Sequence, residues 1–274
     1  MYMTILITGA TSGIGEATAL ELAKNANTMI LPVRNIQKGN TLKTKLIEIN
    51  PSCQIDMFEC DFESLESVKN CANQIVKNYK NLDILINNAG IMEADFRQTK
   101  DNLEAHFQVN VLSQYIFNQI LIPLVPKGGK IINLSSMAHL NGKFELDTIS
   151  AKPSGILSGV GLYSNSNLYR NLLTVKLANE NPNLNINCVH PGIIRTNLGS
   201  QSDNFLWKML MPIFHFFTKP STEGAKTSIY LALTKENISG KYWADCKVKT
   251  PSKLSLDTEL ANKLAQKCKE LTNL

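Results

Sequence analysis

The sequence MTILITGATSGIG occupies residues 3–15 and runs directly into EATALELAKN. The apolar, β-branched run Met3 to Thr8 predicts a buried strand, and the residues after Gly15 predict a helix. Between them, Gly9 permits a tight turn, Gly13 lets a phosphate approach the backbone, and Gly15 lets the helix pack on the strand. The start of that helix offers unpaired N–H groups and a partial positive charge. The pattern predicts a dinucleotide-binding turn, and an ordinary strand-to-helix turn is the alternative. The residues assigned to the cofactor in this turn are Gly9, Thr11, Ser12, Gly13, Ile14 and Gly15.

The composition of the chain is that of a globular protein with a sizeable core. Of its 274 residues, 43% are hydrophobic and 19% are charged, and the net charge is +5. Lysine and arginine are spread along the chain, which argues against a nucleic-acid partner. The six cysteines lack metal-ligand spacing, so we expect free thiols and no metal site. With no transmembrane span, signal peptide or linker apparent, we expect one cytoplasmic domain over residues 1–274.

Strand and helix patterns alternate along the rest of the chain. Strands separated by helices imply parallel crossover connections. We therefore expect an α/β fold, a single-domain doubly wound parallel sheet of the Rossmann type with helices on both faces. The expected strands are Met3–Thr8, Thr28–Val33, Gln54–Glu59, Leu82–Ile86, Gly129–Leu134 and Asn185–Val189. The expected helices after the first are Asn35–Ile49, Glu63–Asn78, Asp101–Leu121 and Gly161–Asn179.

Ligands bind beyond the carboxyl ends of the strands in such a sheet, so the residues at those ends are informative. After the second strand, apolar Val33 precedes Arg34, whose guanidinium suits a 2′-phosphate and favours NADP(H) over NAD(H). A surface arginine without this role is the alternative. After the third strand, Asp61 could bond the adenine amino group, cap the next helix, or do both. After the fourth strand, Asn88, Ala89 and Gly90 leave room for the adenosine half of the cofactor.

The turn TGATSGIG and the tetrapeptide NNAG, residues 87–90, together resemble the short-chain dehydrogenase/reductase family. The resemblance extends over nearly the whole chain and implies oxidoreductase chemistry between a carbonyl and an alcohol. It maps the substrate-orienting serine onto Ser136, the acid/base tyrosine onto Tyr163, and the asparagine that holds a water in the proton path onto Asn110. Hydroxyl and phenol groups can bond a substrate oxygen while hydride moves at its carbon. The resemblance also assigns the stretch after the sixth strand to the nicotinamide carboxamide, with Pro191, Gly192, Ile194 and Thr196.

One departure from the family pattern concerns the helix motif Tyr-x-x-x-Lys. Here the second position is Asn167, so the cation that would lower the pKa of the tyrosine and hold the nicotinamide ribose is missing. Asn167 could still bond a ribose hydroxyl. Arg170 is the nearest cation in the sequence, but about 10 Å of helical rise separates it from Tyr163 and argues against a replacement. Carbonyl reduction needs a neutral tyrosine as acid and should suffer less than alcohol oxidation, so reduction is favoured. The alternative is a non-catalytic NADP(H)-binding sensor or partner-binding protein.

Further motifs resemble the retinol dehydrogenase branch of the family. These motifs are NNAGIM at 87–92, SSMAH at 135–139, VHPG at 189–192, EGAKTS at 223–228 and GKYWADCK at 240–247. The branch implies a lipophilic carbonyl or alcohol as substrate, such as a retinoid or a long-chain aldehyde. Many of its members carry an N-terminal anchor, and we expect no attachment of that kind here because the chain opens on the first strand.

The most apolar segment, FLWKMLMPIFHFF at 205–217, falls in the expected substrate-covering segment at about 197–220. It could form a lid over an apolar pocket, a peripheral membrane contact, or core and subunit packing. We also expect a homo-oligomer, a dimer or tetramer, formed through a helix face. The alternative is that this face is the sheet-facing stripe of each helix. Its candidate residues are Val111, Tyr115, Leu168, Leu172 and Val175. Three histidines are interpreted as structural: His139, His190 and His215.

Overall fold

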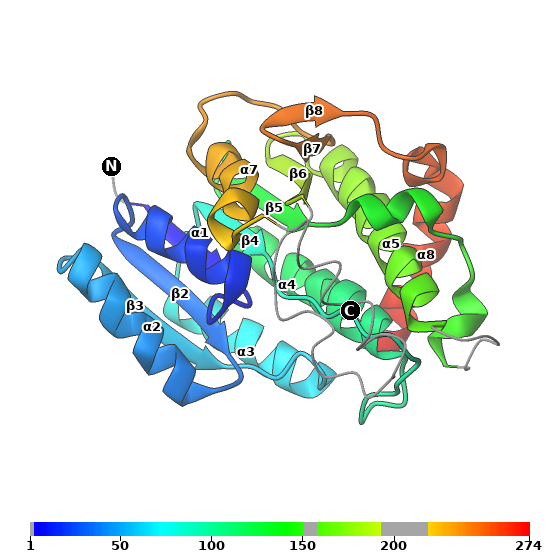
Figure 1. The fold of residues 1–274 in the computed structure, drawn as a ribbon, viewed down its shortest axis with the longest axis horizontal. Coiled ribbons are helices and arrows are strands. Elements are labelled where there is room, and N and C mark those ends of the chain that lie inside the picture. The colour runs from blue at the N-terminus through cyan, green and yellow to red at the C-terminus, as the bar shows by residue number, and fades with distance from the viewer. Residues whose placement is uncertain (1–2, 151–157, 193–218) are drawn as a thin grey trace.

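A computed structural model describes residues 3–150, 158–192 and 219–274 of the protein, and one sheet runs through them. Figure 1 shows helices packed on both faces of this sheet. The strands are β1 (Thr4–Ile7), β2 (Thr28–Val33), β3 (Gln54–Glu59), β4 (Ile84–Asn87), β5 (Lys130–Leu134), β6 (Asn185–His190), β7 (Tyr242–Ala244) and β8 (Lys247–Lys249). The helices are α1 (Gly13–Ala23), α2 (Ile36–Ile49), α3 (Leu65–Asn78), α4 (Ser113–Leu121), α5 (Ser158–Glu180), α7 (Ser221–Leu233) and α8 (Thr258–Thr272).

The sheet has the order β3-β2-β1-β4-β5-β6-β7-β8, with every pair parallel except β7 and β8. The direction of winding reverses between β1 and β4, which is where a doubly wound sheet opens a crevice for a ligand. The expected Rossmann-type fold is therefore confirmed. The last two strands form a hairpin whose turn residues, Asp245 and Cys246, both have positive φ, at 50° and 56°. Positive φ at both central residues is the geometry of a type I′ turn.

Each face of the sheet is covered by its own set of helices. Apolar residues of α1, α2 and α7 form one core layer with the strands, and residues of α3, α4 and α5 form the other. Both layers contain fully buried strand residues, because successive side chains of a strand point to opposite faces. Ile5 and Ile7 belong to the first layer, and Leu6 belongs to the second. A parallel sheet covered on both sides needs such continuous apolar strands.

The helix expected over residues 101–121 begins later than predicted. Thr99 N–H donates to the Leu103 carbonyl and Asn102 has a φ of 59°, so a turn precedes the helix. The carboxylate of Glu104 then caps the first turn by accepting from Phe107 N–H at 2.7 Å. From Phe107 to Leu112 the helix is π-helical before it continues as α4. The wider π turn is a feature often found at functional sites.

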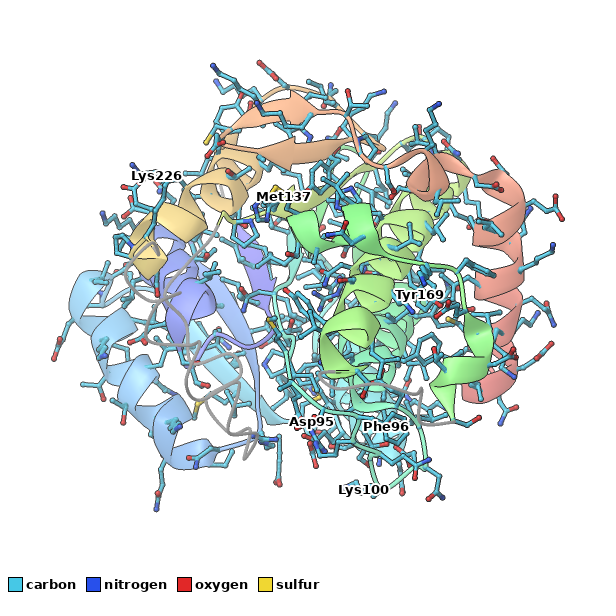
Figure 2. The ribbon with its side chains drawn as sticks, turned by 45° about the vertical axis from the view of Figure 1, so that its right-hand side comes forward. Asp95, Phe96, Lys100, Met137, Tyr169 and Lys226 are labelled. Atoms are coloured by element: carbon cyan, nitrogen blue, oxygen red, sulfur yellow. The ribbon has the colours of Figure 1, made fainter. Side chains whose placement is uncertain are left out.

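The outer side of α5 is covered by α8 from the same chain. Leu168 and Leu172 of α5 are fully buried in a cluster with Ala261, Leu264 and Cys268 of α8. Figure 1 shows α8 alongside α5, and Figure 2 shows Tyr169 on the side of α5 toward α8. The prediction that this apolar stripe is open to a second subunit is therefore wrong for its central residues. The homo-oligomer itself stays a prediction.

The described part of the chain contains no helix with the length and hydropathy needed to cross a bilayer. The segments 193–218 and 151–157 lie outside the described residues. The substrate-covering segment and the apolar stretch at 205–217 fall there, apart from the last residues of the former.

Candidate active site

The glycine-rich turn joins β1 to α1 and has the conformation that its sequence demands. Gly9 and Gly13 have φ values of 65° and 59°, in the left-handed region that favours glycine. A Cβ atom at Gly15 would lie 2.2 Å from the Gly9 carbonyl oxygen, so only glycine fits there. Ser12 is the N-cap residue of α1, yet its side chain makes no capping hydrogen bond. The hydroxyl and the N-terminal N–H groups of α1 thus remain available to a phosphate, with Thr11 half-buried and Ile14 buried beside them.

Hydrogen bonds join the NNAG loop, residues 87–90, directly to this turn. Thr8 Oγ1 accepts from the N–H groups of Asn88 and Ala89 at 3.0 and 2.9 Å. The Asn88 amide donates back to the carbonyls of Thr8 and Gly9 at 3.0 and 3.1 Å. Two segments about 80 residues apart are thereby joined into one unit. Asn88, Ala89 and Gly90 lie beside the turn, as the sequence predicts for cofactor-binding residues.

The adenosine side of the site carries exposed charges in ion pairs. The Arg34 side chain is 65% exposed, and its Nη1 lies 3.6 Å from Glu63 Oε1. Arg97 binds Glu63 and Glu93 at 2.7 Å each. Arg34 follows β2 as predicted, but a carboxylate partly balances its charge. The interaction with Glu63 has no signal in the sequence, because 29 positions separate the two residues.

Asp61 follows β3 and has a local structural role. Its carboxylate accepts from Glu63 N–H at 3.1 Å and lies 3.4 Å from Lys100 Nζ. Ser64 caps α3 by accepting from Ser67 N–H at 3.3 Å. Ser64 is therefore the N-cap of α3, and Asp61, which the sequence offered as a possible cap, closes the turn before it. The prediction that Asp61 also bonds the adenine remains a prediction.

Ser136 and Tyr163 lie at the carboxyl end of the sheet and in the first turns of α5. Ser136 follows β5 and is half-buried, and its hydroxyl accepts from Ala138 N–H at 3.2 Å. Tyr163 is half-buried, with its ring 6.0 Å from the His106 ring in an edge-on arrangement. A serine hydroxyl and a phenol at this edge of the sheet are the groups that the predicted chemistry requires.

Asn110 lies within the π-helical segment and is fully buried. Its side-chain oxygen accepts from Ile91 N–H at 2.8 Å, and its amide donates to Ile91 O at 3.0 Å and to Ser166 Oγ at 3.1 Å. The side chain thus holds the chain that follows the NNAG loop against α5. The predicted water-holding role of Asn110 remains a prediction.

Asn167 takes the place of the motif lysine and is fully buried. Its amide donates to the Tyr163 carbonyl at 2.8 Å, whereas its Oδ1 atom has no hydrogen-bond partner among the described residues. A buried acceptor without a partner costs free energy until a donor arrives. A ribose hydroxyl is a donor that would satisfy this oxygen, in agreement with the predicted contact.

The position of Arg170 corrects an expectation drawn from the sequence. Its Nε donates to the Asn110 carbonyl and its Nη2 to the Ala89 carbonyl, both at 2.6 Å. The guanidinium therefore reaches the predicted cofactor loop, although helical rise alone argues against it. A long side chain that leans toward the helix N-terminus removes much of that separation. The heptad spacing of Tyr163 and Arg170, which places both residues on one side of α5, is the signal of this arrangement in the sequence.

The histidines of the described chain have structural partners. His139 binds the Ser136 carbonyl through Nδ1 and accepts from Ser252 N–H through Nε2. His190 accepts from Met137 N–H, and burial lowers its pKa to about 4. His106, which no sequence motif singles out, accepts from Glu93 N–H and contacts Glu104. His215 lies outside the described residues.

The stretch after β6 is described only in part. Pro191 and Gly192 are half-buried, and Gly192 has a φ of 92°, which turns the backbone away from the sheet. Ile194 and Thr196, the other two residues predicted to meet the nicotinamide carboxamide, lie outside the described residues.

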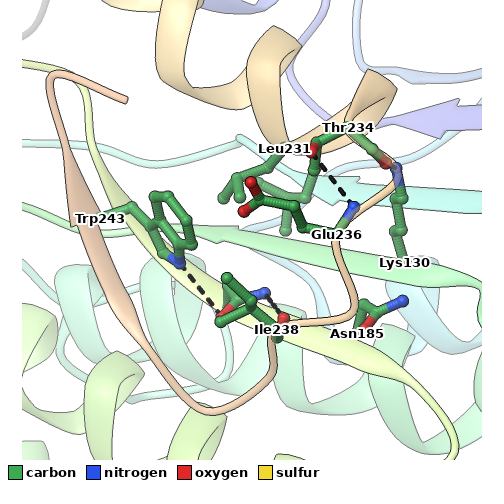
Figure 3. Close-up of a pocket in the computed structure, with 9 residues that line it drawn as sticks. Lys130, Asn185, Leu231, Thr234, Glu236, Ile238 and Trp243 are labelled. Atoms are coloured by element: carbon green, nitrogen blue, oxygen red, sulfur yellow. Dashed lines mark hydrogen bonds between the residues drawn. The ribbon is translucent and has the colours of Figure 1, made fainter. Parts of the chain in front are cut away.

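A separate small pocket lies at the opposite edge of the sheet (Figure 3). Lys130 and Asn185, the first residues of β5 and β6, belong to its lining. Its volume of about 10 Å³ is roughly that of a single water. Lys130 Nζ donates to the carbonyl of Ala232 at 2.7 Å, so it caps the end of α7. This pocket is a structural feature, away from the glycine-rich turn.

Residues 3–206 match the family model for short chain dehydrogenases, and those residues contain the turn, the NNAG loop, Ser136 and Tyr163. The chain belongs to the short-chain dehydrogenase family. It is an oxidoreductase of the class that interconverts alcohols and carbonyls with NAD(P). Short-chain dehydrogenase TIC 32 A of Brassica napus is 34% identical over 96% of this chain and 86% of its own. Human retinol dehydrogenase 13 is 32% identical over 99% and 85%.

Two solved structures illustrate the shared fold. A protein of Mycobacterium paratuberculosis superposes with a TM-score of 0.79 at 26% identity, covering 99% of this chain and 93% of that one. A dehydrogenase from Shigella flexneri, solved in complex with NADP, gives a TM-score of 0.69 at 23% identity, covering 89% and 97%. At 23% identity, the similarity to the Shigella flexneri structure supports a shared fold only.

The residues of this short-chain dehydrogenase fit a dinucleotide. The turn leaves the Ser12 hydroxyl and the start of α1 available to the phosphates, and Asn167 Oδ1 is a buried acceptor without a partner in the described chain. When bound, the cofactor supplies or accepts the hydride. The roles predicted for Ser136, which would orient the substrate oxygen, and for Tyr163, which would exchange its proton, remain predictions.

Proposed function

We propose that this short-chain dehydrogenase reduces lipophilic carbonyl compounds with NADPH. The observation that carries the proposal is that Ser136 follows β5 at the carboxyl end of the sheet, where the neighbouring Ser135 hydroxyl donates to the Asn167 carbonyl and joins this strand end to α5, the helix of Tyr163. The hydroxyls of Ser136 and Tyr163 can bond a carbonyl oxygen, and the Tyr163 phenol can then give it a proton. Reduction begins from the neutral phenol, so it does not require the phenolate to be populated beforehand.

The preference for NADPH rests on Arg34. It is exposed at the end of β2, where Val33 takes the place of an acidic residue that would bind ribose hydroxyls. A guanidinium binds a 2′-phosphate in a charge-assisted, forked geometry. The partial balance by Glu63 at 3.6 Å leaves most of the Arg34 side chain accessible.

The lipophilic substrate class rests on the relatives and on the sequence. Human retinol dehydrogenases 13 and 14 are 32% and 34% identical to this chain. The retinol dehydrogenase motifs and the apolar stretch 205–217 support an apolar substrate of similar kind, a retinoid or a long-chain aldehyde. For that stretch we favour the lid over the peripheral membrane contact.

The test is NADPH oxidation with a panel of aldehydes and ketones of increasing chain length, followed by the absorbance of the reduced cofactor. We expect activity that rises with chain length, and a fall in kcat of about 10²-fold to 10⁴-fold in Tyr163→Phe, because the general acid is removed. NADPH binding and thermal stability of the variant should match those of the wild type. Equal rates in Tyr163→Phe and wild type would refute the role of this helix.

One alternative is favoured by Asn167, which brings no charge to the motif position. In this alternative the chain binds NADP(H) without turnover, as a sensor or partner-binding protein. Tight NADPH binding with no oxidation of the cofactor by any carbonyl in the panel would establish it.

A further inference from the structure

Arg170 is a buried cation whose partners are all neutral. The residue is 5% exposed, and its hydrogen bonds go to the main-chain oxygens of Asn110 and Ala89 at 2.6 Å each. Within residues 3–150, 158–192 and 219–274, no carboxylate forms a salt bridge with it. A charge buried without a counter-ion is costly, and removal of its few partners would leave it uncompensated. Such a group is a candidate for function more than for stability.

The guanidinium lies directly behind the cofactor loop. A Cβ atom at Gly90 would lie 3.1 Å from both Arg170 Nη2 and Asn110 Oδ1, so the absence of a side chain at Gly90 makes room for the charge. The NNAG loop and the segment that contains Asn110 both carry residues predicted for the site. Arg170 binds one carbonyl from each of them.

Arg170 also lies on the Tyr163 side of α5. It follows Tyr163 by seven residues, and its side chain leans toward the helix N-terminus to reach the Ala89 carbonyl. Hydrogen bonds connect the two residues, because Asn110 accepts from Arg170 through its carbonyl and donates through its amide to Ser166 Oγ, which donates to the Tyr163 carbonyl. Burial lowers the pKa of the guanidinium to about 10, so the group remains cationic at neutral pH. A positive charge near a phenol favours its phenolate form.

We propose that Arg170 is the positioning residue that supplies the positive charge missing from position 167. It stabilises the negative charge that Tyr163 acquires on giving up its proton, and it fixes the carbonyls of Ala89 and Asn110 around the site. The inference rests on the proposed function for its catalytic meaning. The electrostatic link between the two side chains can be measured without turnover.

Several titratable groups from other elements face this cluster. His106 contacts the Tyr163 ring from the start of the helix before α4, and it is bound to Glu104. The remaining groups are Glu93 after the NNAG loop, Cys188 on β6, Tyr242 on β7 and His139, which packs on Tyr242. The experiment must therefore isolate Tyr163 from these groups.

The experiment titrates the Tyr163 phenol by its ultraviolet absorbance, as the difference between each variant and the same variant carrying Tyr163→Phe. Arg170→Met should move the midpoint upward by about one pH unit, as expected for the loss of a nearby opposite charge. Arg170→Lys keeps the charge and should keep the midpoint. Lys176→Met, which removes a partly exposed cation from the same helix, is the matched control and should not move it.

A second variant separates charge from packing. In Asn167→Lys combined with Arg170→Met, the charge returns to the family position one helical turn from Tyr163. We expect this double variant to restore the wild-type midpoint. It should also restore most of the rate of alcohol oxidation that Arg170→Met loses, about tenfold near neutral pH if the midpoint moves by one pH unit, because oxidation requires the phenolate. A purely structural role for Arg170 predicts no such rescue, because lysine at 167 cannot remake the bonds to Ala89 and Asn110.

Each outcome supports or overturns the inference. If Arg170→Met and Arg170→Lys move the midpoint equally, or neither moves it, the inference is overturned. If Arg170→Met does not fold, Arg170→Gln takes its place, because its amide can still donate to a main-chain carbonyl while the charge is removed, and it should move the midpoint in the same direction. If the midpoint depends on Arg170 while the wild type reduces no carbonyl, the proposed function fails and the electrostatic link stands. If turnover and its pH profile are unchanged in Arg170→Met, the proposed function stands and the inference fails.

Discussion

The two sides of the site hold positive charge in opposite ways. On the adenosine side, the Arg34 and Arg97 side chains are 65% and 38% exposed and are paired with carboxylates. On the catalytic side, Arg170 is 5% exposed and is bonded to carbonyls. An exposed pair contributes at most about 1 kcal/mol and is screened by salt, whereas a buried charge acts strongly over a short range. The adenosine side is therefore suited to select among soluble cofactors, and the catalytic side to hold one fixed electrostatic arrangement.

The largest effect expected on the adenosine side comes from Arg34→Asp. Reversal of this charge should weaken NADPH binding by about 1.5 to 3 kcal/mol, the range for a hydrogen bond to a charged group, and should leave NADH binding nearly unchanged. Fluorescence titration with both cofactors measures the difference, which should shrink at high salt. Lys226→Asp is the matched control, because Lys226 is an exposed cation of α7 paired with Glu223 (Figure 2). Equal losses of binding free energy for NADPH and NADH would show that Arg34 does not bind the 2′-phosphate.

Burial at the end of β6 should disfavour protonation of His190. The pH dependence of protein stability tests this expectation. Burial lowers the pKa of His190 from 6.5 to about 4, so between these values the unfolded chain binds a proton that the folded chain does not. The contribution to the free energy of unfolding is complete above about pH 6.5 and is lost as the pH falls toward 4, by at most about 1.4 kcal/mol per pH unit. Urea unfolding at about pH 7 and about pH 5, on either side of the unfolded pKa, should show a smaller loss for His190→Gln than for the wild type. Parallel losses would place His190 in a more solvated environment than described.

The smallest effect should come from Glu63→Gln. This change removes the carboxylate that lies 3.6 Å from Arg34, so it frees the guanidinium for a 2′-phosphate. Because exposed pairs are weak, we expect NADPH binding to tighten by only about 0.2 to 1 kcal/mol. The same titration measures it. Weaker binding would instead mean that Glu63 holds Arg34 in position to bind the 2′-phosphate. The adenosine side would then also depend on a fixed arrangement of charges, as the catalytic side does.

The sequence predicted most of the sheet and of the cofactor turn, because both depend on local signals. Alternating apolar strands and helices indicated β1 to β6, with β2 and β3 at their observed bounds. The strands β7 and β8 have three residues each, too few for a periodic pattern, and the Asp245-Cys246 turn lacks the glycine that marks most such hairpins. The packing of α8 on α5 is a contact between segments far apart in the sequence. The apolar stripe of α5 predicts a buried face but not the element that covers it.

The candidate site was predictable as a set of residues and less so as an arrangement. The family resemblance named Ser136, Tyr163 and Asn110, and the structure places them after β5, on α5 and in the π-helical segment before α4. The pairing of Arg34 with Glu63 depends on side-chain directions across distant segments, and no spacing rule encodes it. The heptad spacing of Tyr163 and Arg170 indicates a shared side of α5 but does not reveal the bond from Arg170 to Ala89. The late start of the helix near residue 105 depends on the left-handed conformation of Asn102, which the helical pattern did not indicate.

The bonds that Thr8 forms with the NNAG loop have a consequence for the entropy of cofactor binding. Both cofactor segments are already ordered relative to each other, since Thr8 Oγ1 accepts from Asn88 and Ala89. Little conformational freedom of these segments remains to be lost when a dinucleotide arrives, so more of the interaction free energy appears as affinity. A ligand that binds the folded chain alone stabilises it by RT ln(1 + [L]/Kd). Thermal unfolding with increasing NADPH should follow this relation, and the dissociation constant obtained from it should include little cost for ordering these two segments.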